Sequence, residues 1–369
     1  MSDPQAVTPQ VPPPPPPIPQ QPRLQPGQTP PPVRKARLSG CWMIFLGMLL
    51  VFIVGSLWLG SAVKSGLSEM TEKSELKTQY VEGQGQDQIA LIPVTGVIGG
   101  QPEAVGGANS MIAKVTEQLR RAVADHHVKA IVLEIDSPGG GVTASDVLYQ
   151  EILEAQKSGK KIVVHMSDVC ASGGYYISAP ADTIIASPTT ITGSIGVIMH
   201  LMNASELLEK KLGIKLDTVQ SGDHKDIMSM SRPLTAEERK ILQDLVNEMY
   251  ERFVGIVVQG RKGKGKIPAD VSGATDYIKK LADGRIFSGA EAVKNGLADK
   301  TGYLSDAFAE ARRLTGLNQA TVVRYVRNFG IFEALMGASV NLNLGLQLNA
   351  GDLRKELLPG LEYRWAPGE

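Results

Sequence analysis

The chain has 369 residues, enough for one large domain or two modest ones with extensions. Lys plus Arg and Asp plus Glu both number 38, so the formal net charge is zero. No basic run is interleaved with aromatic residues, and we therefore expect no nucleic-acid partner. The two cysteines, Cys41 and Cys170, are expected to be separated by a membrane boundary, which excludes a disulfide-stapled secreted domain.

The N-terminal segment 1–37 is dominated by proline. Residues 1–33 hold 14 of the 23 prolines, six of them consecutive. Such a run cannot form a helix or a sheet and favours polyproline II or disorder. We interpret it as a solvated tail, with a docking site for a proline-binding partner as the alternative.

Residues 38–63 form 26 consecutive uncharged, mostly apolar positions. This is longer than the roughly 20 residues that cross a bilayer, and longer than a usual signal-peptide core. Arg34, Lys35 and Arg37 precede it, which predicts a cytoplasmic N-terminus. The pattern predicts a single-pass anchor in the cell (inner) membrane, with the body of the protein extracytoplasmic or periplasmic.

Residues 64–88 are polar and predict a linker, and residue 89 begins a regular alternation of β and α patterns. Continuous apolar runs separated by amphipathic helices are typical of parallel strands covered by helices, so the expected class is α/β. We expect strands at 89–98, 129–135, 161–166, 183–186, 190–198 and 215–220, and helices at 110–124, 144–155, from 235 onward, 290–295 and 305–314. The expected domain spans 89–316. Residues 317–369 are predicted to be a C-terminal extension, with a strand at 320–327 and no readable role.

The most informative stretch follows the predicted strand at 161–166. Ser172 stands among Ala171, Gly173 and Gly174, where a strand gives way to a helix. Such a serine has an exposed hydroxyl and free backbone N–H groups beside it, which is the geometry of a serine nucleophile. The small neighbours allow a substrate backbone to approach closely.

A serine nucleophile needs a base. None of the five histidines has a recognisable acidic partner, and the Gly-x-Ser-x-Gly motif is absent. Lysine is the other option, if burial keeps its amine neutral. Lys225 follows a β-like run and precedes apolar residues that could shield it. Cys170 has no histidine partner and is expected to pack as a small buried side chain.

Four motifs in order carry a family resemblance. They are Asp-Ser-Pro-Gly-Gly at 136–140, Ala-Ser-Gly-Gly-Tyr-Tyr at 171–176, Thr-Gly-Ser-Ile-Gly-Val at 192–197, and Ser-Gly at 221–222 followed by Lys-Asp at 225–226. Together they resemble the short, single-domain form of the signal peptide peptidase A family, over about residues 89–315. The family consists of membrane-anchored serine proteases.

The resemblance implies a role for each matched residue. Ser172 is implied as the nucleophile, Lys225 as the general base and Ser194 as the hydroxyl that orients the lysine. The N–H groups of Gly139 and Gly173 are implied as the oxyanion hole, while Gly140 and Gly141 can be read as plain loop glycines. No metal or other cofactor is implied.

The resemblance also implies a ClpP/crotonase fold of stacked βαβ units and a homo-oligomer in which serine and lysine come from neighbouring subunits. The implied substrates are cleaved signal peptides or other short hydrophobic or unfolded segments. Two alternatives remain open: a crotonase-like acyl-CoA enzyme and a non-catalytic membrane scaffold. His224, directly before the lysine, departs from the expected pattern without explanation.

Overall fold

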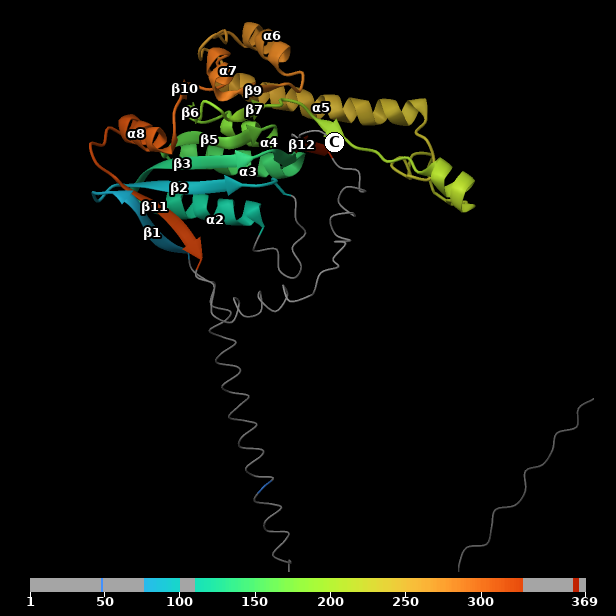
Figure 1. Cartoon of the computed structure of the whole chain (residues 1–369), viewed down its shortest axis with the longest axis horizontal. Coiled ribbons are helices and arrows are strands. Elements are labelled where there is room, and N and C mark those ends of the chain that lie inside the picture. The colour runs from blue at the N-terminus through green and yellow to red at the C-terminus, as the bar shows by residue number, and fades with distance from the viewer. Residues whose placement is uncertain (1–47, 49–75, 100–109, 328–360, 365–369) are drawn as a thin grey trace, which may run out of the picture. The chain divides into compact units, whose positions relative to one another are not determined.

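The computed structural model describes residues 48, 76–99, 110–327 and 361–364 (Figure 1). Apart from Met48, these residues belong to one unit, Lys73–Glu369. Its centre is a nine-stranded sheet with the order β1-β11-β2-β3-β5-β6-β10, to which β7 and β9 add at one end of β5. The strands are β1 Leu76–Gly83, β2 Gln88–Thr95, β3 Val128–Ser137, β5 Lys161–Ala171, β6 Thr183–Ala186, β7 Ile191–Gly193, β9 Ile286–Ser288, β10 Lys300–Thr301 and β11 Thr321–Arg327.

The middle of the sheet is parallel. β11, β2, β3, β5, β6 and β10 pair in parallel, and only the edge strand β1 and the short β9 pair antiparallel. The apolar runs of β2, β3 and β5 are buried on both faces, as the sequence predicts for parallel strands. The α/β class is confirmed.

Helices cover both faces of this sheet (Figure 1). They are α2 Met111–Ala124, α3 Val142–Lys157, α4 Gly173–Ser178, α5 Ala236–Arg261, α6 Val271–Leu281, α7 Gly289–Lys294 and α8 Leu304–Thr315. Ala90 and Ile92 of β2 belong to the larger buried cluster, with side chains of α2 through α7. Ile89 and Leu91 point to the other face and pack against α8. The alternation along one strand thus builds two cores.

A second, smaller sheet joins distant parts of the sequence. It has the order β4-β12-β8, formed by β4 Gly139–Gly141, β12 Leu361–Arg364 and β8 Ile198–Met199. β12 runs antiparallel to both of its neighbours. A strand from near the end of the sequence therefore lies against the predicted glycine-rich loop.

The structure extends the sheet beyond both predicted domain boundaries. β1 forms within the segment predicted as a linker, and it pairs with β11, which lies in the segment predicted as an extension. β11 in turn pairs with β2, so both strands belong to the central sheet.

The prediction of a strand at 215–220 is wrong, because these residues are exposed and form no ladder. The expected strand at 190–198 is reduced to the short β7 and β8, and α6 was not expected. Among the described residues no helix has the length and apolar character needed to cross a bilayer. The predicted anchor at 38–63 lies outside them except for Met48.

Candidate active site

Ser172 occupies a strained turn between β5 and α4. Its φ of 51° and ψ of −113° are rare for a residue with a side chain, and it caps α4 without a side-chain hydrogen bond. Its backbone N–H donates to the Gly193 carbonyl at 2.8 Å, which holds the turn against β7. Strain of this kind, on the order of 1–3 kcal/mol, persists only where the surroundings enforce it. The serine therefore stands at the strand-to-helix turn that the sequence predicts, but it is only 1 % exposed, whereas the sequence predicts an exposed hydroxyl.

The residue after the serine must be glycine. A Cβ on Gly173 would lie 2.5 Å from the Ser145 hydroxyl oxygen and 3.1 Å from both Gly139 Cα and Gly140 N. The first turn of α4 therefore lies directly against the loop that follows β3. This contact brings free N–H donors of a helix start beside the serine.

The glycine-rich loop orients its donors differently from the prediction. Gly139 has a φ of 98°, and its N–H donates to the Ser137 hydroxyl at 3.1 Å. The Ile98 N–H donates to the Gly139 carbonyl at 2.8 Å, and the Gly141 N–H donates to the Ile98 carbonyl at 2.9 Å. Because backbone groups alternate along a strand, the N–H and carbonyl of Gly140 point to the opposite side, toward β12.

Ser194 lies beside Ser172 at the end of the neighbouring strand. Ala171 of β5 is paired with Gly193 of β7. Each serine is the next residue along its strand, so the two serines lie at the same end of the two strands. Ser194 has a φ of 48°, is 8 % exposed, and donates its N–H to the Arg285 carbonyl at 2.8 Å. Within the described part of the chain, neither serine hydroxyl makes a hydrogen bond. Two buried serines with strained backbones thus lie at the same end of the sheet, and neither hydroxyl has a hydrogen-bond partner among the described residues.

Lys225 is exposed, in a turn of the segment that joins β8 to α5 and extends away from the sheet in Figure 1. Its backbone N–H bonds to the Gly222 carbonyl, and no described residue forms a hydrogen bond or ion pair with its amine. The structure brings Ser172, Ser194, Gly139 and Gly173 together and leaves Lys225 in solvent.

Charged neighbours fix the segment around the lysine. Arg232 bonds to both Asp226 and Glu238, and its bond to Glu238, together with the bond from the Thr235 backbone N–H, lowers the pKa of Glu238 to about 2. His224 lies 3.7 and 3.8 Å from the carboxylates of Glu237 and Glu238. His224 therefore lies beside the carboxylates at the start of α5.

The residues around the serine turn have packing roles. Burial raises the pKa of the Cys170 thiol to about 12, so the thiol stays neutral and is no nucleophile, as the sequence predicts. The Tyr175 hydroxyl donates to the Leu297 carbonyl, and the Tyr176 hydroxyl donates to Asp146. Both rings are fully buried beneath the turn.

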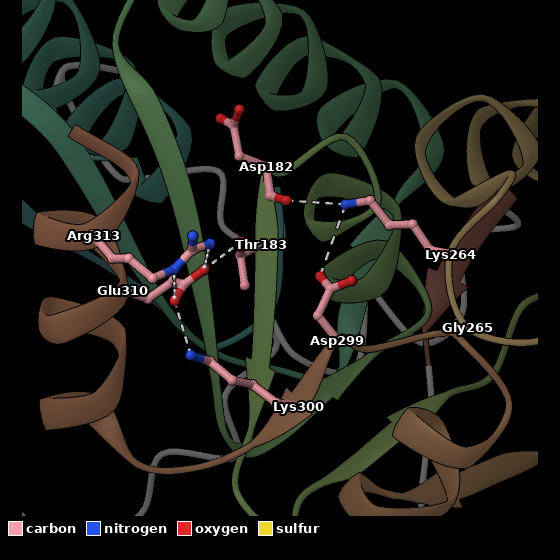
Figure 2. Close-up of a pocket in the computed structure, with 8 residues that line it drawn as sticks. All are labelled: Asp182, Thr183, Lys264, Gly265, Asp299, Lys300, Glu310 and Arg313. Atoms are coloured by element: carbon pink, nitrogen blue, oxygen red, sulfur yellow. Dashed lines mark hydrogen bonds and ion pairs between the residues drawn. The ribbon is translucent and has the colours of Figure 1, made fainter. Parts of the chain in front are cut away.

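A cavity of about 430 Å³ lies elsewhere, between β6, β10 and α8 (Figure 2). None of the predicted site residues lines it. Glu310 accepts hydrogen bonds from Thr183, Lys300 and Arg313, and Lys264 donates to the Asp182 carbonyl and lies 3.8 Å from Asp299. Because Glu310 of α8 is bonded to Thr183 and Lys300 as well as to Arg313 of its own helix, we interpret these bonds as a clamp that holds α8.

The clamp predicts acid-sensitive stability. The bond from Arg313, with those from Lys300 and Thr183, lowers the pKa of Glu310 from 4.5 to about 2. A depressed pKa stabilises the fold above the ordinary value, and this contribution is lost as pH falls from about 4.5 toward 2. Glu310→Gln should lower the unfolding free energy by about 2 kcal/mol at pH 7 and by much less at pH 3.

Urea unfolding at both pH values checks this expectation. Glu154→Gln is the matched control, because its ion pair with Lys157 is exposed and contributes little. An equal loss at both pH values for Glu310→Gln would contradict the clamp.

The fold and the serine turn at Ser172 together define a class of protein. An α/β enzyme with a strained serine beside a glycine-rich loop is typical of a serine hydrolase. Comparison with known proteins gives the family. Residues 154–318 match the model of "Peptidase family S49", a range that includes Ser172, Ser194 and Lys225.

Curated relatives agree with this match. The chain is 36 % identical to a "Putative signal peptide peptidase SppA" of Enterococcus faecium over 78 % of this chain and 80 % of the relative. It is 39 % identical to "Putative protease MJ0651" of Methanocaldococcus jannaschii over 64 % of this chain and 71 % of that one. It is 38 % identical to "Protease 4" of Salmonella typhi over 63 % of this chain and 35 % of that longer protein. The chain belongs to peptidase family S49 and is a serine-type endopeptidase.

Proposed function

We propose that this chain is a membrane-anchored endopeptidase that cleaves signal peptides or other short hydrophobic or unfolded segments with a Ser-Lys dyad. The printed name of the Enterococcus relative supports the substrate class. The uncharged segment 38–63 supports the anchor, since tethering concentrates the enzyme where such peptides are released. The basic residues before that segment support an extracytoplasmic, periplasmic catalytic domain.

The observation that carries the proposal is the pair of strained serines. In this account Ser172 attacks the peptide carbonyl, and its proton passes to the amine of Lys225. Ser194 accepts a hydrogen bond from that amine and orients it. The lysine then protonates the leaving amine, and the same group activates the water that hydrolyses the acyl-enzyme.

The oxyanion hole in this account differs by one residue from the sequence expectation. The Gly139 N–H is engaged by Ser137, so it is a poor candidate. The Gly140 N–H points to the side of β4 where β12 lies, so a substrate would take the place of β12 to meet it, and Gly140 N lies close to Gly173. Donors from Gly140 and Gly173 are therefore proposed to stabilise the tetrahedral oxyanion. The ClpP/crotonase arrangement of stacked βαβ units is proposed with them, since it places such a loop beside the nucleophile.

Lys225 is proposed to reach Ser172 of a neighbouring copy. Apolar side chains are exposed along the segment that carries the lysine and along the first turns of α5: Leu201, Met202, Leu207, Leu212, Ile214, Leu216, Val219, Met228, Met230, Ile241 and Leu245. A contiguous apolar surface is typical of an interface, and these side chains are proposed to form one. Packing between copies would bury it and would shield the amine from water, which favours the neutral base.

Hydrolysis of a Leu/Ala-rich peptide by the full chain in detergent micelles tests the proposal. We expect endoproteolytic products, identified by mass spectrometry, and much slower cleavage of a peptide of the same length rich in Lys and Glu. Absence of cleavage of both peptides, or measurable binding of a CoA thioester at the same turn, would favour another function.

A further inference from the structure

Lys225 is followed directly by a carboxylate that does not pair with it. Asp226 accepts hydrogen bonds from Nε of Arg232 at 3.0 Å and from Nη2 at 2.6 Å, and these bonds lower the pKa of the Asp226 carboxyl. The amine of Lys225 forms no hydrogen bond or ion pair with any described residue. A neighbouring carboxylate normally attracts an ammonium and favours its charged form. The arginine therefore binds the group that the lysine would otherwise attract.

The same guanidinium binds a second carboxylate at the start of α5. Its Nη1 and Nη2 donate to Glu238 at 2.8 and 2.6 Å, and Glu238 is only 1 % exposed. Glu238 also accepts from the Thr235 N–H at 2.9 Å, in the capping box of the helix. Two-pronged bonds to two carboxylates fix the position of a guanidinium strongly. The turn that carries Lys225 is thus tied to the first turn of a 26-residue helix.

The surroundings of the lysine are rich in negative charge. Besides Lys225 and His224, residues 221–239 hold four carboxylates and two arginines: Asp223, Asp226, Glu237, Glu238, Arg232 and Arg239. His224 lies 3.7 Å from Glu237 and 3.8 Å from Glu238. Of the two arginines, only Arg232 bonds to carboxylates within the described part of the chain. Loss of this one guanidinium would leave the lysine beside unpaired carboxylates.

We propose that Arg232 is a positioning residue for Lys225. It fixes the turn that carries the lysine to α5, and it keeps both of its carboxylate partners from pairing with the lysine amine. The proposal rests on the proposed Ser-Lys function for its consequence and on the bonds of Arg232 for its geometry. An amine without a carboxylate partner loses its proton more readily and can then accept the proton of the serine.

Paired substitutions separate this role from a merely structural one. Arg232→Met removes the guanidinium and leaves Asp226 unpaired beside the lysine. Asp226→Asn in the same chain then removes that carboxylate. If the arginine only stabilised the fold, the double variant would be no better than Arg232→Met. If the arginine keeps the amine unpaired, the second change rescues the first.

Steady-state hydrolysis of a Leu/Ala-rich peptide by the full chain, measured across pH, is the first test. Arg232→Met should lower kcat at least about tenfold with KM within about twofold, and should move the acid limb of kcat upward by about one pH unit. Asp226→Asn/Arg232→Met should return the acid limb and recover kcat severalfold. An unmoved acid limb in Arg232→Met, or a double variant no more active than the single one, would overturn the proposal.

Two further variants control this test, with circular dichroism to verify folding. Arg232→Lys keeps the charge but cannot make both two-pronged bonds, so kcat should fall at least about threefold while the acid limb stays in place. Full kcat in Arg232→Lys would contradict the proposal even if Arg232→Met does not fold. Arg120→Met is the matched control, because Arg120 makes a two-pronged bond to Glu151 outside the four motifs, and its pH profile should not change.

Labelling of the lysine amine needs no catalysis. Acetylation of Lys225 by acetic anhydride, quantified by mass spectrometry at each pH, should shift upward by about one pH unit in Arg232→Met and return in the double variant. If no peptide is hydrolysed but the labelling shifts, the role of Arg232 stands while the proposed function fails. If peptides are hydrolysed but neither the acid limb nor the labelling shifts, the function stands and the role of Arg232 is wrong.

Discussion

Ser172→Ala should reduce kcat/KM for peptide hydrolysis by at least about 10³-fold, because removal of a serine nucleophile leaves only binding and oxyanion stabilisation. The change deletes one oxygen that makes no hydrogen bond among the described residues, so folding should be preserved. Alanine meets the same backbone strain as serine at φ 51°, and the melting temperature should stay within about 2 °C.

The measurement is the initial rate on a Leu/Ala-rich peptide, with circular dichroism on the same preparation. Ser158→Ala is a control for handling, since Ser158 is exposed at the end of α3 and belongs to none of the four motifs. A Ser172→Ala protein with more than a tenth of the normal rate would remove this serine from the mechanism.

Mixing two inactive variants should restore activity. If each site takes its serine from one copy and its lysine from the next, Ser172→Ala and Lys225→Ala subunits assembled together form intact sites. With random mixing in equal amounts, a site has an intact serine with probability one half and an intact lysine with probability one half. About one quarter of the normal activity should therefore return.

The co-assembled material must be compared with each variant alone and with the two variants mixed after separate assembly. Native mass spectrometry verifies that particles contain both subunits. Mixed particles without recovered activity would show that the lysine does not act across an interface. The exposure of Lys225 in the single chain is the reason for expecting the opposite result.

The fold was predictable where the pattern is local. The strands that became β2, β3, β5 and β6 are continuous apolar runs, and the helix expected from 235 onward begins as α5, where Thr235 and Glu238 form a capping box. The signal for α6 was also present, since Asp270 caps it and Ala274 and Ile278 repeat at helical spacing. The segment 215–220 misled because its alternating residues resemble a strand, yet no other described strand pairs with it.

Of the candidate site, the sequence predicts the serine turn and the neighbouring serine, but not which backbone groups face the cleaved bond. A strand followed by Ser172 and two glycines indicates the strained turn, and the neighbouring Thr-Gly-Ser motif indicates Ser194. Which glycine has a backbone N–H free to donate depends on the Ser137 hydroxyl and on Ile98. Neither contact can be predicted from the local sequence. β12 was likewise unpredictable, because its pairing joins segments more than 150 residues apart.

The most direct test is covalent trapping with a fluorophosphonate probe on the full chain, followed by mapping of the adduct by mass spectrometry. We expect a single adduct on Ser172, formed at least about 100-fold more slowly in Lys225→Ala, because the hydroxyl then lacks its base. An adduct on a different residue, or equal labelling rates with and without the lysine amine, would contradict the account.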